Sequence, residues 1–398
     1  MRLEGAGAEG LRLERHELLL LEDVERACRE LRPLEERHYL AHNFNEEVVE
    51  VARRFGLGGM PIPPEYGGRG AGYLAYVLAL ERIGREGVGA RTFFSGHTSL
   101  GQLTLLRWAS EELKQRYLSP STRCELVLAY ALTEPGAGSN PRELSSEYTA
   151  EGTRYILNGE KYLISNGSIA DALIVFAYPK GKREGMSAFV VDAKEQGVEA
   201  MRLTEKIGIP TSDTGYIRLR GVSVPKENLL GQEGRGLHVA FYALMNGRLS
   251  VAAGNLGVLQ DLIDELSSYA KQGDGRLARQ QPFQAALAEM AVDLEAGRAL
   301  TYKAAEAKQL YESRPEDLEL RRRADLLIAQ AKFFTSQAAY RAARAAVSLL
   351  GPSSISFSRR AARHLVDVRV TRIYEGTDEI LKLRIAQGLL GDEYRAFI

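Results

Sequence analysis

Residues 153–165, TRYILNGEKYLIS, are rich in β-branched and aromatic residues and contain Asn158-Gly159, the strongest short signal for a β-hairpin. We therefore expect two short strands joined at Asn158-Gly159. Further strand-like runs follow at short spacing: DALIVFAY (171–178), SAFVVDA (187–193) and GYIRLRGVSV (215–224). Because no long helix separates them, these runs predict an antiparallel sheet or small barrel rather than parallel βαβ units.

The segments on either side of this β-rich region read as helices. Residues 16 to about 120 show helical apolar periodicity, and long amphipathic helices return from Gly236 onward. Four or five long helices with short connections favour an antiparallel bundle. We therefore expect an α+β chain of three domains. These are an N-terminal α-helical domain (1–122), a middle antiparallel β-sheet or barrel domain (123–234) and a C-terminal helical bundle (235–398).

The composition argues against several classes of partner. Lys plus Arg and Asp plus Glu are balanced at 52 each in 398 residues, so neither nucleic acid nor an anionic membrane surface is expected. The two cysteines, Cys28 and Cys124, fit a reducing compartment and no disulfide framework. No stretch approaches the roughly 20 apolar residues of a membrane span, and the four-leucine run at 18–21 is too short for a signal sequence. We expect a cytoplasmic protein without membrane insertion.

Common catalytic and metal motifs are missing from the sequence. It contains no P-loop, no G-x-S-x-G elbow and no CxxC pair, which argues against most kinases and hydrolases. His38 and His42 are spaced as two ligands on one helix would be. No third ligand is close in sequence, so an exposed pair is favoured over a metal site, and no metal is expected.

Residues 130–140, YALTEPGAGSN, combine hydroxyl groups, a carboxylate and a Pro-Gly turn. Such a loop exposes successive backbone N–H groups, which bind phosphate oxygens and other electronegative edges. By itself the stretch is more often a plain turn between a helix and a sheet, so its meaning depends on the motifs around it.

Six segments between residues 56 and 380 together resemble the acyl-CoA dehydrogenases, and they occur in that family's order. The α, β, α arrangement expected above is also the family's architecture. The segments are GLGGMPIPPEYGGRG (56–70), YALTEPGAGSN (130–140), YILNGEKYLISNGSIADALIVFA (155–177), EKIGIPTSDTGYIRLRGVSVPKENLLG (205–231), ALMNGRLSVAAGNLGV (243–258) and RIYEGTDEI (372–380).

The resemblance implies FAD as the cofactor, bound between the β domain and the helical bundle. Residues 130–133 would follow the pyrimidine edge of the flavin, Ser139 would lie near the pyrophosphate, and Ser165 near flavin N5 and O4. Leu163 stands where many relatives have a tryptophan that shields the ring. The cofactor-binding residues implied in this way are Tyr130, Ala131, Leu132, Thr133, Gly138, Ser139, Leu163, Ile164, Ser165, Gly351 and Thr377.

Glu375, in RIYEGTDEIL (372–381), matches the family's catalytic base. The resemblance implies that it removes the α proton of an acyl-CoA while the β hydrogen leaves as hydride to flavin N5, giving the trans-2-enoyl-CoA. Burial can strengthen a carboxylate as a base, and hydrogen bonds to the thioester carbonyl can stabilise the developing enolate. Without the other motifs, Glu375 or Asp378 would equally suit an acid that complements the dipole of a helix N-terminus.

A further set of residues is implied for the acyl-CoA substrate. Arg248 matches the arginine that grips the CoA moiety. Arg91 and Ser95 stand where glutaryl-CoA dehydrogenases have an Arg and a Ser at the distal end of the acyl pocket, so Arg91 could pair with an ω-carboxylate. An arginine facing solvent is an equal alternative. The substrate-binding residues implied are Ser139, Arg248, Arg91, Ser95, Tyr374 and Gly376.

The sequence departs from the family's pattern on the adenosine side of the cofactor site, where neighbouring subunits usually meet. FAD is therefore expected to bind more weakly, or to be held by other groups such as Arg276 or Arg279. The residues that replace the usual ones are Gly273, Ser348, Pro352 and Ser354.

The resemblance also bears on partners and on alternatives. It implies that electrons pass to an electron-transfer flavoprotein and that the chain forms a homotetramer, a dimer of dimers. A cofactor-impaired acyl-CoA-binding relative and an acyl-CoA oxidase stay open as alternatives to the dehydrogenase.

Overall fold

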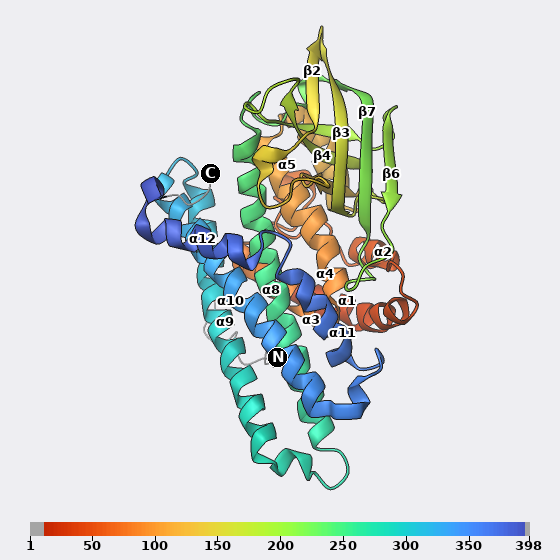
Figure 1. Cartoon of the computed structure of the whole chain (residues 1–398), viewed down its shortest axis with the longest axis vertical. Coiled ribbons are helices and arrows are strands. Elements are labelled where there is room, and N and C mark those ends of the chain that lie inside the picture. The colour runs from red at the N-terminus through yellow and green to blue at the C-terminus, as the bar shows by residue number, and fades with distance from the viewer. Residues whose placement is uncertain (1–11, 395–398) are drawn as a thin grey trace.

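The computed structural model describes residues 12–394, and Figure 1 shows a β-sheet at one end of the molecule with long helices running to the other end. The order along the chain is helical, then β, then helical again. The three-part fold class expected from the sequence is therefore confirmed, while the boundaries at 122 and 234 stay predictions. Among the described residues, no helix combines the length and apolarity needed to cross a membrane.

The N-terminal region is a set of helices that continue into one another through short turns. A π-helical segment, Ser95–Gln102, joins α4 to α5, and all of its residues are buried. A second π-helical segment, Lys114–Leu118, lies between α6 and α7. The helices are α1 (Arg15–Leu40), α2 (Glu47–Arg54), α3 (Tyr73–Glu86), α4 (Val88–Phe94), α5 (Leu103–Trp108), α6 (Glu111–Leu113) and α7 (Ser119–Thr122).

The middle region is one sheet of seven strands in the order β1-β4-β2-β3-β7-β6, with β5 paired to β4. Most pairings are antiparallel, as expected, but β4 runs parallel to both β1 and β2. The sheet has an apolar core of its own that includes Tyr148, Phe189 and Ile217. The strands are β1 (Leu128–Ala131), β2 (Glu147–Glu151), β3 (Arg154–Ser165), β4 (Ala172–Pro179), β5 (Ser187–Asp192), β6 (Val198–Arg202) and β7 (Thr214–Pro225).

The hairpin predicted at Asn158-Gly159 is wrong. Residues 154–165 form one continuous strand, β3, and the turn to β2 lies at residues 152–153. Gly159 (φ +150°) instead marks an irregularity in the pairing with β7, and a Cβ there would lie 2.1 Å from Oγ of Ser146. The Asn158 side chain accepts a hydrogen bond from the N–H of Gly221 at 2.8 Å. Pairing of β3 with β7 over nearly its whole length overrides the local turn preference.

The C-terminal region is a helical bundle in which α8, α9 and α10 pack along one another (Figure 1). Helix α8 also packs closely on α3 of the N-terminal region, because glycines meet at the contact. A Cβ on Gly84 would lie 2.6 Å from Cα of Gly254, and one on Gly257 would lie 2.1 Å from the carbonyl oxygen of Glu81. The helices are α8 (Gly236–Ala270), α9 (Gln281–Ser313), α10 (Leu318–Leu350), α11 (Arg360–Thr371) and α12 (Asp378–Leu390).

Candidate active site

Residues 372–378, which comprise the loop between α11 and α12 and the first residue of α12, have an unusual backbone and are called the base loop below. Glu375 has φ +56° and Gly376 has φ +94°, so two consecutive residues lie in the left-handed region. This conformation is uncommon for a residue with a side chain and persists where surrounding contacts over-determine it. Thr377 then caps α12, since its hydroxyl accepts a hydrogen bond from the N–H of Ile380 at 3.2 Å.

The Glu375 side chain points into the protein, against α8. A Cβ added to Gly247 would lie 2.4 Å from Oε2 of Glu375, so only glycine leaves room for the carboxylate there. In the part of the chain that the structure describes, Oε2 is buried and has no hydrogen-bond partner. Burial raises the pKa of Glu375 to about 7, although the nearby cations Arg248, Lys332 and Arg91 oppose this shift. The carboxylate is therefore poised to gain or lose a proton near neutral pH.

Two buried cations hold the consecutive backbone carbonyls of Glu375 and Gly376. Nε of Arg248, on α8, donates to the carbonyl oxygen of Glu375 at 3.0 Å. Nζ of Lys332, on α10, donates to the carbonyl oxygen of Gly376 at 2.7 Å. Asp378, the first residue of α12, accepts from Arg372, Ser336 and Gln337 at 2.6, 3.0 and 2.7 Å. The base loop is thus fixed to both α8 and α10.

Arg91 and Ser95, predicted for the distal end of the acyl pocket, are both buried, with exposed fractions of 1% and 4%. The solvent-facing alternative for Arg91 is therefore excluded. The guanidinium donates to the Tyr374 hydroxyl and lies 5.5 Å from the centre of the Tyr374 ring. Nε and Nη1 of Arg91 and Oγ of Ser95 have no partner among the described residues. A Cβ on Gly254 would lie 2.8 Å from Nε of Arg91, so the guanidinium, like Glu375, faces a glycine of α8.

The residues predicted for the flavin edge come together where β1 and β3 end. The N–H of Tyr162 donates to the carbonyl oxygen of Thr133 at 2.8 Å, which joins the two segments. Leu163 sits in the left-handed region (φ +57°) beside a break in strand pairing, and it is 55% exposed despite its apolar side chain. Tyr130 is buried, and its hydroxyl donates to the carbonyl oxygen of Ala240 at 3.2 Å.

Residues 134–140 are called the rim loop below. Its first residue is held by buried contacts, whereas most of the residues that follow are exposed. Nζ of Lys161 donates to Oε1 of Glu134 at 2.7 Å, and both side chains are buried. Glu134 also accepts from Ser145 and Ser146. Ser139 is exposed, and a Cβ on Gly136 would meet no atom within 4 Å.

The flavin edge and the rim loop fit a bound FAD. Leu163 offers an exposed apolar surface for a planar ring, and the open space over Gly136 and Gly138 leaves backbone within reach of a ligand. Among the described residues, none hydrogen-bonds to the hydroxyl groups of Thr133, Ser139 or Ser165. These groups could hold the electronegative edge of the ring and the phosphates.

One predicted cofactor residue, Gly351, does not join this cluster. It ends α10, 19 residues beyond Lys332, which is about 28 Å along a helix. Of the adenosine-side positions, Gly273, Ser348 and Pro352 are exposed, whereas Ser354 is buried. Arg276, suggested as an alternative contact, pairs with Asp274 at 2.6 Å, with 85% of its side chain exposed.

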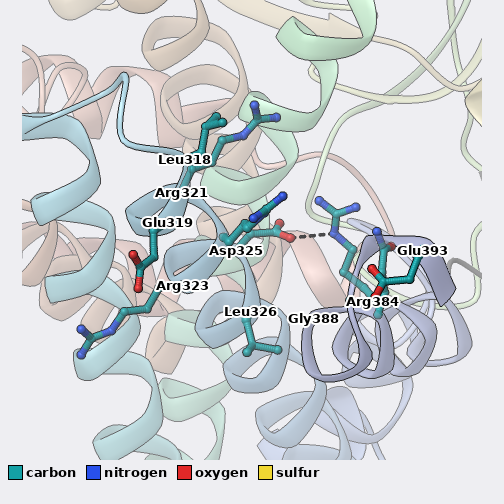
Figure 2. A pocket seen from close by; sticks show the side chains of 12 residues that line it. Leu318, Glu319, Arg321, Arg323, Asp325, Leu326, Arg384, Gly388 and Glu393 are labelled. Atoms are coloured by element: carbon teal, nitrogen blue, oxygen red, sulfur yellow. Dashed lines mark hydrogen bonds and ion pairs between the residues drawn. The ribbon is translucent and has the colours of Figure 1, made fainter.

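Sequence reasoning missed a pocket of about 750 Å³ between the first turns of α10 and the last turns of α12. Figure 2 shows Asp325 and Arg384 meeting across it, with Nε of Arg384 2.6 Å from Oδ2 of Asp325. Oδ1 of Asp325 accepts from Arg248 at 3.4 Å, which links the pocket to the base loop. The run Arg321-Arg322-Arg323 was the available sequence signal. The lining residues are Leu318, Glu319, Arg321, Arg322, Arg323, Asp325, Leu326, Arg384, Gln387, Gly388, Gly391 and Glu393.

Sequence comparisons identify relatives over most of the chain. Models of the N-terminal, middle and C-terminal domains of acyl-CoA dehydrogenases match residues 14–125, 129–222 and 234–390. A protein of Bacillus subtilis named acyl-CoA dehydrogenase is 35% identical over 370 residues, which cover 92% of this chain and 95% of that protein. Subunit CarC of the caffeyl-CoA reductase–Etf complex of Acetobacterium woodii is 34% identical over 353 residues, or 87% of this chain and 90% of that protein.

Solved structures agree with these matches. Butyryl-CoA dehydrogenase from Megasphaera elsdenii superposes with a TM-score of 0.89 at 30% identity, covering 96% of this chain and all of that one. A glutaryl-CoA dehydrogenase from Mycobacterium smegmatis in complex with FADH2 gives a TM-score of 0.88 at 27% identity, with 97% of each chain covered. The prediction of a flavin-dependent oxidoreductase with FAD as cofactor is confirmed. The chain belongs to the acyl-CoA dehydrogenase family.

Proposed function

We propose that this chain removes hydrogen from the α and β carbons of an acyl-CoA thioester, with Glu375 as the base. The α proton passes to the Glu375 carboxylate, the β hydrogen leaves as hydride, and the trans-2-enoyl-CoA forms. FAD, when bound, supplies the acceptor for that hydride and its two electrons. The observation that carries the proposal is the buried, unpartnered Oε2 of Glu375 beside Gly247.

The protonation behaviour of Glu375 supports this role. A general base works best when its pKa is close to the working pH, and burial raises the pKa of Glu375 to about 7. The backbone N–H of Glu375 donates to no other described residue, while its carbonyl oxygen is already held by Arg248. This N–H is free to hydrogen-bond to the thioester oxygen, where negative charge develops as the α proton leaves.

We propose that the CoA part of the substrate lies in the pocket between α10 and α12. Arg321, Arg323 and Arg384 line this pocket, and guanidinium groups suit phosphate oxygens. Arg248, matched by resemblance to a CoA contact, is buried and bonded to Glu375 and Asp325. Arg248 would lie between the CoA pocket and the base loop, and its bonds to Asp325 and Glu375 would connect the two.

The distal end of the acyl site favours a substrate with an ω-carboxylate. Arg91 is a buried cation, and no described carboxylate forms an ion pair with it, although an unpaired buried charge is costly. The glycines that face Glu375 and Arg91 are seven residues apart on α8, about 10.5 Å along the helix axis. That span suits a short dicarboxylic acyl chain whose α carbon lies at Glu375 and whose acid reaches Arg91 and Ser95.

We also propose an electron-transfer flavoprotein as the electron acceptor and a homotetramer as the assembly. The similarity to a subunit named for its complex with Etf supports the first proposal. The second is supported by the position of Gly351 at the end of α10, 19 residues or about 28 Å along the helix from Lys332. In this family such a glycine serves the cofactor of a neighbouring subunit.

The decisive experiment is anaerobic reduction of the FAD-loaded protein by a panel of thioesters that includes butyryl-, hexanoyl-, palmitoyl- and glutaryl-CoA. Glutaryl-CoA should bleach the flavin fastest, and Glu375→Gln should keep the flavin spectrum while slowing reduction by at least about 1,000-fold. Reduction of Glu375→Gln at a rate close to that of the wild type would refute the assignment of the base. If butyryl-CoA and glutaryl-CoA react equally well, the role given to Arg91 is wrong.

A further inference from the structure

We propose that Lys332 is a positioning residue for Glu375: its side chain holds the base loop in the conformation that aims the carboxylate, and its ammonium favours the ionised form. This inference rests on the proposed function. It concerns a residue on α10 that lies outside the motifs carrying the family resemblance.

The first observation is the burial of Lys332. Its side chain has an exposed fraction of 0%, although it lies in the middle of a helix whose other buried residues are mostly alanines. Among the described residues, no carboxylate is close enough to form an ion pair with it. Removing an ammonium from water costs several kcal/mol, and an apolar side chain of the same length would avoid that cost. A purely space-filling role therefore does not explain a lysine here.

The second observation is the hydrogen bond that the ammonium makes, its one hydrogen bond within residues 12–394. Nζ donates to the carbonyl oxygen of Gly376 at 2.7 Å, next to the base and within the pair of left-handed residues. Arg248 holds the preceding carbonyl, and Ser336, one helical turn beyond Lys332, holds Asp378. Along the loop, Lys332 therefore lies between the attachments made by Arg248 and Ser336, and it fixes the Gly376–Thr377 peptide plane, one residue beyond Glu375.

The third observation is electrostatic. The charged groups that act on Glu375 come from three elements: Arg248 on α8, Arg91 on α4 and Lys332 on α10, with the Tyr130 hydroxyl from β1 also nearby. The groups that act on Lys332 are Asp378, Arg248, Glu375 and Arg372. Burial lowers the pKa of Lys332 to about 7. Below this pH the ammonium favours the carboxylate form of Glu375, and above it the neutral amine can still donate to Gly376.

Two substitutions distinguish the effect of the hydrogen bond that Lys332 donates from the effect of its positive charge. Lys332→Met removes both and keeps a similar length, while Lys332→Gln keeps an N–H donor without the charge. Lys308→Met is the matched control, because Lys308 is also 0% exposed but lies on α9 and pairs with Glu312. The measurements are FAD content, thermal unfolding, and the rate of flavin reduction by the best thioester from pH 6 to 9. The protonation of Glu375 is followed by its infrared carboxyl band, assigned by subtracting the spectrum of Glu375→Gln.

At pH 9, Lys332→Met should lower the maximal rate of flavin reduction by about 10- to 100-fold with KM changed by less than about threefold, while Lys332→Gln should recover most of the rate. At pH 6 both variants should be slow, because the midpoint of the Glu375 carboxyl band moves upward by about 1 pH unit without the cation. Lys308→Met should match the wild type in both measurements.

A reduction rate for Lys332→Met within about twofold of the wild type across this pH range would overturn the inference. So would loss of thermal stability with an unchanged rate per bound flavin, which is the behaviour of a merely structural residue. If Lys332→Met does not fold, Lys332→Gln decides, and an unshifted carboxyl band in that variant refutes the role of the charge. An inactive Glu375→Gln beside a fully active Lys332→Met would remove only this inference. An active Glu375→Gln would instead remove the proposed function itself.

Discussion

The base loop and the rim loop are the two segments that most directly carry the predicted site, and they are built in opposite ways. Side chains from α8 and α10 hold the base loop at Glu375, Gly376 and Asp378, and every one of these contacts comes from the chain itself. In the rim loop, Glu134 makes a buried ion pair with Lys161 and Ala137 is buried, but Pro135, Gly136, Gly138 and Ser139 are exposed, and a Cβ on Gly136 would meet no atom within 4 Å.

This difference separates what the polypeptide prepares alone from what a ligand completes. A group that must take a proton from carbon has to be aimed and desolvated before the substrate arrives, so its surroundings are preorganised. A loop that binds a large cofactor needs surface left free for it. Ordering such a loop consumes part of the free energy of ligand binding. Ligand-binding loops are therefore found among the less stable parts of a fold.

The substitution with the largest expected effect is at Lys161, because the Lys161–Glu134 ion pair is a buried attachment of the rim loop. Replacing Lys161 by Met leaves Glu134 buried without its cation, which should lower the free energy of unfolding by about 4 kcal/mol. Urea unfolding at pH 7 measures this. Burial alone would raise the pKa of Glu134, but Lys161 and the hydrogen bonds from Ser145 and Ser146 lower it to about 2. The stabilisation is therefore present above pH 4.5 and is lost as the pH falls towards 2.

Lys332→Met is the control for that measurement. It also removes a buried lysine but leaves no ion-pair partner behind, so it should cost little stability or even add some. Equal losses in the two variants would mean that the two loops are anchored alike, contrary to the comparison.

A smaller effect concerns the pH dependence of stability at the base loop. Burial raises the pKa of Glu375 from 4.5 to about 7, so the folded state binds a proton more tightly than the unfolded state does. Stability from this group is complete below pH 4.5 and is lost as the pH rises through about 7, by about 3 kcal/mol. Glu375→Gln cannot lose a proton, so its free energy of unfolding should exceed that of the wild type by about this amount at pH 8 and match it at pH 4.5.

The difference between the two proteins is the quantity to measure, at one protein concentration and without substrate. Burial also raises the pKa of Glu35 to about 7 and of Asp367 to about 6, and these groups titrate equally in both proteins, so they cancel. A difference that does not change with pH would contradict the preorganised burial of Glu375.

The parts of the structure that the sequence predicted are those that depend on local patterns. Period and composition predicted the α, β, α order. The motif at 372–381 singled out Glu375, whose Oε2 the structure places in a buried position, while its role as the base stays a proposal. The failure at Asn158-Gly159 has a clear cause, since pairing of β3 with a strand about 60 residues further on decided the outcome. Arg91 could be buried or exposed on sequence grounds, and its enclosure depends on the packing of α4 against Gly254 of α8, which lies far away along the chain.

Lys332 and the pocket at Asp325 and Arg384 could not be predicted for a related reason. Their meaning comes from neighbours that lie 44 and 59 residues away along the chain. A lysine among alanines or a run of three arginines reads as helix surface until the fold supplies the partner.

The smallest and most selective effect is expected when one methyl group is added at a glycine of each site: Gly247, which faces Glu375, and Gly136, within the rim loop. In Gly247→Ala the new Cβ would lie 2.4 Å from Oε2 of Glu375, and the clash is with the end of a flexible side chain. The carboxylate should therefore move while the fold is kept, slowing flavin reduction by about 100-fold, or about 2.7 kcal/mol in activation free energy, with little change in thermal unfolding. In Gly136→Ala the methyl group meets no protein atom within 4 Å, so any effect should fall on the affinity for FAD and not on the reduction rate of flavin already bound. Stopped-flow reduction at saturating FAD separates the two. If both variants slow reduction equally, the base loop is no more preorganised than the rim loop, and the contrast between them fails.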